Sequence, residues 1–594
     1  MKKLNLSFFS SGYFLLILVF FLLVIVKILI SSYFKSPWIF PDETVYAETA
    51  RNILHGEFYS KLNYIQTYPP GYSFFLSTVY LLFDNSLANY QFMLIINSFL
   101  TSSIIFPVFF LLKKYCSDKF SLLGSVLVAI LPSVVLYNFV VMSENLFIPL
   151  FVFSLWFLIE SFETNSKKWG ILVGFSIFLL FFTRSPGIAM IIGFFFALAY
   201  YIFMQLKLKK PLTILKENNC SILAFFIPAI LWTYYKSKLE ITTGEYNIAA
   251  YTSAVFQAGS NIQSFTRFLL LFIHEVEFLI LASYFIFFVL ALYSLYLILR
   301  WCPNNFEDSS KLKENQKKMA SKSGALYFLV SSILLIIITV AHMSLAKPPE
   351  DLYYSIFGRY IDPIVPIIII FGLIGLYNVL NKNSEKKKII LLLITSILPL
   401  IILFAIDFPS TYYRPPNMFT LLYIQKVSTF LPVIQFIIIF AILLLGFFTI
   451  IMYYKKFWPI FIIFLMIISI TGFYSTLQFQ STTSSNTEKI MQIGQYLITN
   501  SNESSRILMT KEDYNFRGGY QIWFGTQFYI KGYLIRKDTC STLSNNSILS
   551  NDNCQQNRDL DYIISHKNLP YPLITTSDMG FKLYKFKRPE NKTI

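Results

Sequence analysis

A cluster of acidic and aromatic side chains follows closely after the first long apolar stretch of the chain. The segment from 41 to 54 reads PDETVYAETARNIL, with Asp42 and Glu43 directly after Pro41. Proline restricts the residue before it to extended geometry, so we expect a break here and a short helix after it. Asp42 and Glu43 would open that helix, where a carboxylate either takes part in chemistry or only interacts with the helix dipole. The residues alone leave both interpretations open.

Two short helices are expected to lie at a membrane surface in this region. The first is amphipathic, with apolar residues at Val45, Ala50, Ile53 and Leu54, which suits a helix at the interface. Further on, residues 67–72 read TYPPGY and precede an apolar run from 74 to 83. That run is too short to cross a bilayer, so we expect a second interfacial helix after the stiff proline turn.

Membrane-spanning helices must position these residues. Only 14% of the 594 residues are charged, whereas a soluble protein keeps about a quarter of its residues charged. Apolar runs that reach or approach the ~20 residues of a spanning helix recur along the chain. We predict an all-α polytopic membrane protein with about thirteen spanning helices. They are placed near residues 13–33, 89–112, 120–141, 143–163, 168–183, 185–206, 218–236, 268–299, 324–346, 361–380, 387–407, 428–454 and 456–477.

Basic residues set the expected orientation of these helices. With this assignment, lysines of successive loops (113–114, 167–168, 207–210, 311–322, 386–388 and 455–456) fall on the side of Lys2 and Lys3. The positive-inside rule makes that side the cytoplasm. We therefore expect a multi-pass protein of the cell membrane with a cytoplasmic N-terminus. The net charge of +17 belongs to these loops, so no nucleic-acid partner is expected.

The chain divides into two expected domains. Residues 1–478 form the membrane module, with a first external loop at 34–88, and residues 479–594 form a small soluble α/β domain. That domain should contain a helix at 485–499 and short strands near 506–510, 528–535, 562–565 and 582–586. An odd number of spanning helices places it outside the cell, on the same face as the first loop. Polar residues that carry function concentrate in loops held by a rigid scaffold, so the external face is where we expect the chemistry.

At this point the chain resembles the GT-C superfamily of membrane glycosyltransferases. The resemblance rests on a first spanning helix followed by D-E-T-x-Y-A-E-x-A-R-N, and on Y-P-P-G-Y before an interfacial helix. Two later segments also fit, MSENL at 142–146 and GRYIDP at 358–363. The branch that looks most similar contains the bacterial aminoarabinose transferase and the protein O-mannosyltransferases. A soluble C-terminal domain after the last helix is part of the same architecture.

The resemblance implies a reaction. Enzymes of this superfamily take a sugar from a polyprenyl-phosphate carrier and pass it to a glycan, lipid or protein acceptor on the outer face. The essential first-loop aspartate of the family corresponds to Asp42, whose expected role is general base. Glu43, its neighbour in the motif, is the second candidate catalytic residue. A base must be within hydrogen-bond reach of the proton that it removes. The product would have inverted anomeric configuration.

The lipid phosphate needs cationic partners. Candidates are Arg359, Lys347, Arg184 and Lys61, and arginine suits phosphate because its fork can bind two oxygens at once. For Arg184, snorkelling of the side chain to the interface is the simpler explanation from sequence alone. The aminoarabinose-transferase branch has a basic residue just before its paired prolines, where this chain has Tyr68. The phosphate contact is therefore expected elsewhere, at Lys61 or Arg359.

The substrate pocket is expected to include Tyr46, Tyr68, Glu350, Asp351 and Tyr360. Oligosaccharyltransferases of the superfamily bind a divalent ion with D-x-D motifs, whereas Asp42 and Glu43 are adjacent and point about 100° apart on a helix. This pattern matches the metal-independent members better. Glu350 and Asp351 could still supply oxygen ligands for Mg²⁺ or Mn²⁺, so a divalent cation remains an option, and no metal ligands are assigned.

Two other functions compete with the transferase. A secondary transporter would explain many helices and buried ionisable groups, but transporters usually contain internal repeats and helices broken near the midplane. We find no repeat, and the polar residues gather at one face. A non-catalytic membrane scaffold would explain the C-terminal domain and leave the first-loop motif without an explanation.

Overall fold

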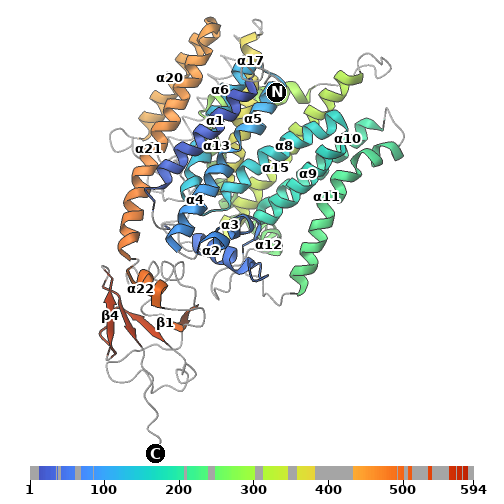
Figure 1. Ribbon diagram of the computed structural model, residues 1–594. Helices are drawn as coiled ribbons and strands as arrows, with labels where there is room; N and C mark the ends of the chain where they lie inside the picture. The colour runs from blue at the N-terminus through green and yellow to red at the C-terminus, as the bar shows by residue number, and fades with distance from the viewer. Residues whose placement is uncertain are drawn as a thin grey trace, which may run out of the picture.

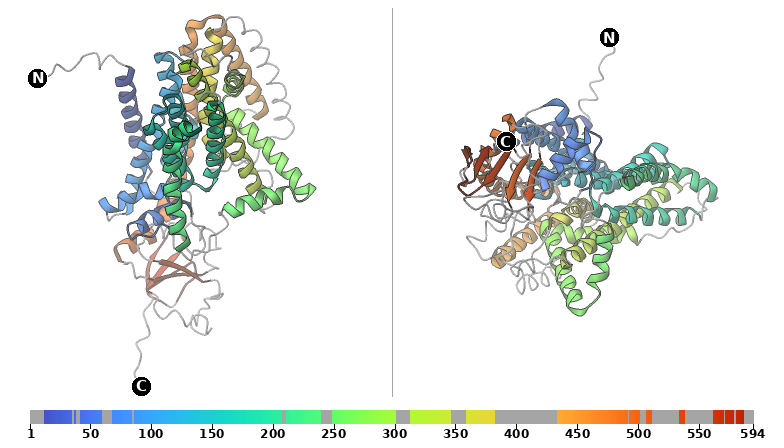
Figure 2. Two further views of the ribbon diagram at one scale, coloured as in Figure 1. Left: turned by 90° about the vertical axis from the view of Figure 1, so that its right-hand side faces the viewer. Right: turned by 90° about the horizontal axis from the view of Figure 1, so that it is seen from below.

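The computed structural model shows a bundle of long helices with a small sheet beyond one end, next to the C-terminus (Figure 1). Two further views show the same sheet at one end of the bundle (Figure 2). The structure describes residues 12–34, 37, 42–59, 68–83, 86–206, 211–238, 248–300, 312–345, 358–381, 433–490, 492–500, 506–510, 533–537, 561–569, 571–577 and 580–585.

The first half of the bundle contains the helices that surround the candidate site. They are α1 (Gly12–Ser31), α2 (Asp42–Ile53), α3 (Gly71–Leu82), α4 (Ser86–Ser102), α5 (Ile105–Lys113), α6 (Asp118–Ala129), α7 (Pro132–Val135), the 3-10 turn η2 (Leu136–Phe139), α8 (Glu144–Thr164), α9 (Lys167–Thr183), the turn η3 (Ser185–Gly187), α10 (Ile188–Gln205) and α11 (Pro211–Lys238).

The second half completes the bundle and leads to the sheet. Its helices are α12 (Ile248–Ala258), α13 (Ile262–Ala282), α14 (Ile286–Leu299), α15 (Leu312–Leu345), α16 (Gly358–Ile361), η6 (Asp362–Ile364), α17 (Val365–Asn381), α20 (Val433–Tyr453), η9 (Lys455–Phe457), α21 (Trp458–Ile490) and α22 (Gln492–Asn500).

Several of these helices have the length and apolar composition of membrane spans. Six do so among the described residues, or up to eight if each of two bent pairs is one span. The expected all-helical polytopic class is confirmed. The number thirteen stays a prediction, because the expected helix at 387–407 lies outside the described residues.

Two expected helices are broken in the structure. The helix expected at 120–141 bends by 58° between α6 and the segment Pro132–Phe139. Pro132 begins α7, and Leu131 before it is extended (ψ 140°), as the residue preceding a proline prefers. The single helix expected at 268–299 is wrong, because α13 and α14 meet at 99°. At that corner Tyr284 and Phe285 have φ values of 56° and 53°, which no helix can accommodate.

The C-terminal domain is built on a five-stranded mixed sheet. Its strands are β1 (Arg506–Thr510), β2 (Tyr533–Lys537), β3 (Tyr562–Ser565), β4 (Leu573–Thr576) and β5 (Lys582–Lys585), in the order β2-β1-β3-β5-β4. Strand β1 is parallel to β2 and β3, and β5 is antiparallel to β3 and β4. Ile493 and Leu497 of α22 pack on one face of the sheet. The sequence predicts such a small α/β sheet, with two differences: β4 is additional, and the strand expected at 528–535 is described only as β2 at 533–537, since 528–532 lie outside the described residues.

Helix α21 joins the two parts. It runs without a break from Trp458 to Ile490, so the expected boundary at 478/479 falls inside it. The N-terminal half of the expected helix at 485–499 belongs to α21, and its other half is α22.

Candidate active site

Helix α2 begins at Asp42 and lies almost entirely within the protein. Nearly every residue from Asp42 to Asn52 is buried, so the helix is packed on all sides. The expectation of a surface amphipathic helix is therefore corrected for α2: its polar side chains have partners inside the protein. Helix α3 packs against it, and both lie at the end of the bundle nearest the sheet domain (Figure 1).

The two carboxylates that open α2 point in different directions. The carboxylate of Glu43 accepts a hydrogen bond from the backbone N–H of Val141 at 3.0 Å and one from the Tyr90 hydroxyl at 3.4 Å. It is fully buried and does not line the pocket beside Asp42. Glu43 thus ties α2 to the broken segment after η2, and a direct catalytic role for it stays a prediction that this geometry does not favour.

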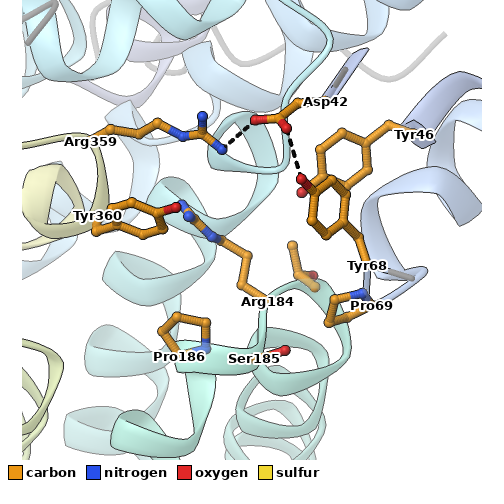
Figure 3. A pocket seen from close by; sticks show the side chains of 10 residues that line it. Asp42, Tyr46, Tyr68, Pro69, Arg184, Ser185, Pro186, Arg359 and Tyr360 are labelled. Carbon is orange, nitrogen blue, oxygen red and sulfur yellow. Dashed lines mark hydrogen bonds and ion pairs between the residues drawn. The ribbon is translucent and has the colours of Figure 1, made fainter. Parts of the chain in front are cut away.

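Asp42 lines a cavity of about 200 Å³ between four parts of the bundle. Figure 3 shows side chains from the start of α2, from the segment before α3, from the α9–α10 junction and from α16 pointing into one space. The lining residues are Asp42, Tyr46, Tyr68, Pro69, Thr183, Arg184, Ser185, Pro186, Arg359 and Tyr360. Six of them were predicted as site residues from the sequence: Asp42, Tyr46, Tyr68, Arg184, Arg359 and Tyr360.

Both oxygens of the Asp42 carboxylate have a donor. Tyr68 donates its hydroxyl hydrogen to Oδ1 at 2.7 Å, and Nη2 of Arg359 lies 2.7 Å from Oδ2 (Figure 3). Burial, and then the charge of Asp42, raise the pKa of Tyr68 well above its usual value. Tyr68 therefore stays protonated and acts as a donor to the carboxylate, in the position where the related branch has a cation.

A second carboxylate, Glu144, holds two arginines together. Its Oε1 atom lies 2.8 Å from Nη1 of Arg184 and accepts a hydrogen bond from Nε of Arg359 at 2.8 Å. The side chain of Glu144 is 0% exposed. Both guanidinium groups also lie over the ring of Tyr360, at 5.3 and 5.6 Å from its centroid. Such contacts are attractive because the ring face is electron-rich.

The local sequence explains the positions of Arg184 and Arg359. Arg184 is extended (φ −149°) and ends α9 before the Ser185–Gly187 turn, so its side chain leaves the helix toward the cavity. Arg359 is the second residue of α16, and a Cβ on Gly358 would overlap the ring of Phe278. A side chain in place of Gly358 would push α16 away from α13.

Tyr46 completes the wall on the side of α2. Its hydroxyl donates to Oγ of Ser143 at 2.8 Å, directly before Glu144, and its ring lies against those of Tyr68 and Tyr72. Burial raises the pKa of Tyr46 above its usual value, so it too remains a neutral donor. Tyr46 thereby links the helix that carries Asp42 to the segment that carries Glu144.

The remaining predicted residues cannot be compared in the same way. Lys61, Lys347, Glu350 and Asp351 lie outside the described residues. Glu144 was not predicted as a site residue, although its position at the start of an outer-side helix in MSENL offered a signal. That signal does not show the role of Glu144, which depends on pairing with Arg359, a residue distant in sequence.

A divalent cation does not fit the described carboxylates. Asp42 is already paired with Arg359, and Glu144 with both arginines. Two guanidinium groups beside a dication would repel it, and no group of three or more potential metal ligands occurs among the described residues. We derive no step through a metal.

Comparisons with known proteins agree with this architecture. Residues 67–232 match the family model described as dolichyl-phosphate-mannose-protein mannosyltransferase. That stretch contains Tyr68, Glu144 and Arg184 and covers less than half of the chain. No curated protein sequence matches the chain at a significant level.

Among solved structures, ArnT from Cupriavidus metallidurans bound to undecaprenyl phosphate has a TM-score of 0.51 and 11% identity. The match covers 87% of this chain and 85% of that one. Its apo state gives 0.46 at 12% identity, over 89% and 86% of the two chains. The oligosaccharyltransferase of Archaeoglobus fulgidus gives 0.41 at 12% identity, over 92% and 69%. Only the first of these scores exceeds 0.5, so the inference about fold rests on it.

The helical bundle, the sheet domain after it and the partial family match together define a class. The chain is a multi-pass membrane protein with the fold of the GT-C membrane glycosyltransferases. The resemblance indicated by the first-loop motif is thus confirmed at the level of the fold.

Proposed function

We propose that this protein is an inverting glycosyltransferase that moves a sugar from a polyprenyl-phosphate carrier to an acceptor hydroxyl. The observation that carries this proposal is the cavity itself, in which one carboxylate, Asp42, lies beside the partly buried guanidinium of Arg359 and shares the lining with the buried Arg184. A base and a cationic phosphate site are the two parts that such a transfer requires. The related fold of ArnT, solved with undecaprenyl phosphate bound, supports the choice of a lipid phosphate as the donor.

The reaction balances with the residues present. The acceptor oxygen forms a bond to the anomeric carbon while its proton passes to Asp42. The bond from that carbon to the phosphate oxygen breaks, and its electron pair stays on the phosphate, which gains one negative charge. Arg184 and Arg359 stand where this charge develops, and preorganised cations in a water-poor site stabilise it more than water would. Attack from the face opposite the phosphate inverts the anomeric configuration.

The outer side of the membrane is the proposed location of the site. Asp42 and Tyr46 of α2 line the cavity, and α2 lies at the end of the bundle next to the sheet domain (Figure 1). Lysines gather in a set of loops that includes Lys113 at the end of α5 and Lys167 at the start of α9. The positive-inside rule assigns the side with these lysines to the cytoplasm. The acceptor would then be a glycan, a lipid or a protein of the cell envelope.

The first experiment replaces the candidate base. Membranes containing wild type or Asp42→Asn are supplied with radiolabelled polyprenyl-phosphate sugars, and transfer to endogenous acceptors is followed. Asn keeps the shape of the side chain and cannot take the proton, so we expect the rate to fall by roughly 10²–10⁴-fold, the usual contribution of a general base.

The matched control is Asp118→Asn, which removes the carboxylate of an exposed ion pair with Lys113 far from the cavity. It should transfer sugar at the wild-type rate. Equal transfer by wild type and a correctly inserted Asp42→Asn would exclude Asp42 as the base. If wild type, Asp42→Asn and Asp118→Asn all fail to transfer sugar from every donor of a panel, the proposed reaction is contradicted.

A further inference from the structure

Arg359 contacts two anionic side chains at once. Its Nε atom donates to Glu144 at 2.8 Å, and its Nη2 atom lies 2.7 Å from Oδ2 of Asp42. Under the proposed function the same guanidinium must also bind the donor phosphate. The guanidinium has five N–H donors in a planar fork, so a phosphate competes with Asp42 when it binds the same Nη2 edge.

The two existing contacts of Arg359 differ in how easily they can be exchanged. Glu144 is 0% exposed and is held by Arg184 as well, so this partner is fixed inside the protein. Asp42 lines the cavity and has a second donor in Tyr68. A phosphate that enters the cavity meets the side of Arg359 that faces Asp42. It can replace the Asp42 carboxylate there without disturbing the contact with Glu144.

We propose that Asp42 occupies the phosphate position of Arg359 while the donor is absent, and that the lipid phosphate displaces it. This inference rests on the proposed function. Displacement leaves Tyr68 on Oδ1 of Asp42 and exposes Oδ2 to the cavity, where the acceptor hydroxyl can donate to it. The base becomes accessible only when its donor substrate is bound, which imposes an order with donor first and acceptor second.

Neutralising Asp42 should affect the binding of lipid phosphate in opposite directions, depending on whether Asp42 competes with phosphate or only positions Arg359. If Asp42 competes with phosphate for Arg359, neutralising Asp42 should strengthen the binding of a lipid phosphate. If Asp42 only holds Arg359 in place, neutralising it should weaken binding or leave it unchanged. Asparagine is the informative replacement, because its carbonyl oxygen can still accept from Tyr68 and it has no negative charge to compete with phosphate.

The experiment measures the dissociation constant of undecaprenyl phosphate for the full-length protein in lipid nanodiscs. The variants are Asp42→Asn, Arg359→Gln, the double variant of both, and Asp118→Asn as the control from a surface ion pair. We expect Asp42→Asn to bind about tenfold more tightly than wild type, since buried charge pairs couple by more than ~1.4 kcal/mol. The gain should disappear in the double variant, and Asp118→Asn should match wild type.

Undecaprenol, which lacks the phosphate, separates this effect from changes in the isoprenoid site. It should bind equally to wild type and Asp42→Asn. A gain in affinity cannot arise from partial unfolding, so the expected result is unambiguous. Equal or weaker binding of undecaprenyl phosphate by Asp42→Asn, with wild type binding normally, would overturn this inference and leave the proposed function standing. If no protein binds the lipid phosphate, both fail.

Discussion

Four ionisable residues of the pocket alternate in charge along one line of contacts. Asp42 touches Arg359, Arg359 touches Glu144, and Glu144 touches Arg184. Buried charges are tolerated only when they are paired, and removal of one partner typically costs about 3–5 kcal/mol because the other remains buried without compensation. The order of charges therefore fixes each side chain by its neighbour. It brings two guanidinium groups together without a net positive charge in the empty cavity.

At Arg359 the shape of the head group should count for more than its charge. Lysine has a single ammonium group, which cannot span Glu144 and Asp42 as the guanidinium does through Nε and Nη2. We expect Arg359→Lys to lose at least one charge-assisted hydrogen bond of about 1.5–3 kcal/mol, and kcat/KM to fall by roughly 10–100-fold. The measurement is steady-state transfer from the donor identified with wild type.

The control for this substitution is the half-buried Lys113, which forms an ion pair with the exposed Asp118. Lys113→Arg should leave the rate unchanged. A normal kcat/KM for Arg359→Lys would mean that positive charge alone suffices at this position, and that the fork of Arg359 is not used.

At the scale of elements, the approach of α3 to the end of α9 sets the width of the pocket. A Cβ atom on Gly71 would stand 2.6 Å from the carbonyl oxygen of Phe182, so only glycine allows this contact. Gly71 lies three residues after Tyr68, directly after the paired prolines, and Phe182 lies two residues before Arg184. The contact therefore keeps Tyr68 and Arg184 on opposite sides of one narrow cavity.

Replacing Gly71 by alanine should separate these elements. We expect Gly71→Ala to lower the free energy of unfolding by about 1–3 kcal/mol, the usual cost of an overpacked site, and to reduce transfer at the same time. Thermal unfolding of the purified protein gives the first value. Gly446 in α20 is the control, because nothing lies within 4 Å of an added Cβ there. Gly446→Ala should be neutral or stabilising, since alanine favours helices; equal unfolding temperatures for both variants would contradict the steric explanation.

Most helices could be predicted from the sequence because an apolar run is a local signal. The breaks within helices could be predicted only in part. A run of apolar residues predicts α8, α10 and α17 whatever surrounds them. The corner between α13 and α14 has neither proline nor glycine: Ser283, Tyr284 and Phe285 adopt it through packing that the sequence does not display. The bend at Pro132, in contrast, has a visible cause.

The candidate site likewise has a part that the sequence predicts and a part that only the fold shows. Asp42 and Arg359 were predicted because their motifs resemble those of a known superfamily, whereas Arg184 was only one of several cations expected on the external side. The pairing among them was not predicted, because each comes from a different part of the chain and the contacts form only in the folded bundle. Glu144 lies at the centre of those contacts and carries no distinguishing local pattern.

At the scale of the whole molecule, the proposed sidedness can be measured directly. Single cysteines are introduced into a cysteine-free chain at Lys167, the first residue of α9, and at Thr576 of β4, both of which are exposed. A membrane-impermeant maleimide should label Thr576→Cys in intact cells and Lys167→Cys only after permeabilisation, as the positive-inside rule requires. The reverse pattern would place the cavity in the cytoplasm and contradict an extracytoplasmic reaction.

Helix α21 has a mechanical consequence that neither the pocket nor the sheet shows by itself. Its 33 residues make a continuous rod of about 50 Å at ~1.5 Å per residue, and α22 and the sheet follow at its end. The length of such a helix sets both the distance and the rotation of the sheet domain relative to the bundle. Each residue gained or lost in α21 would turn the sheet domain by about 100° about the helix axis. The number of residues in α21 therefore determines which face of the sheet domain is turned toward the end of the bundle.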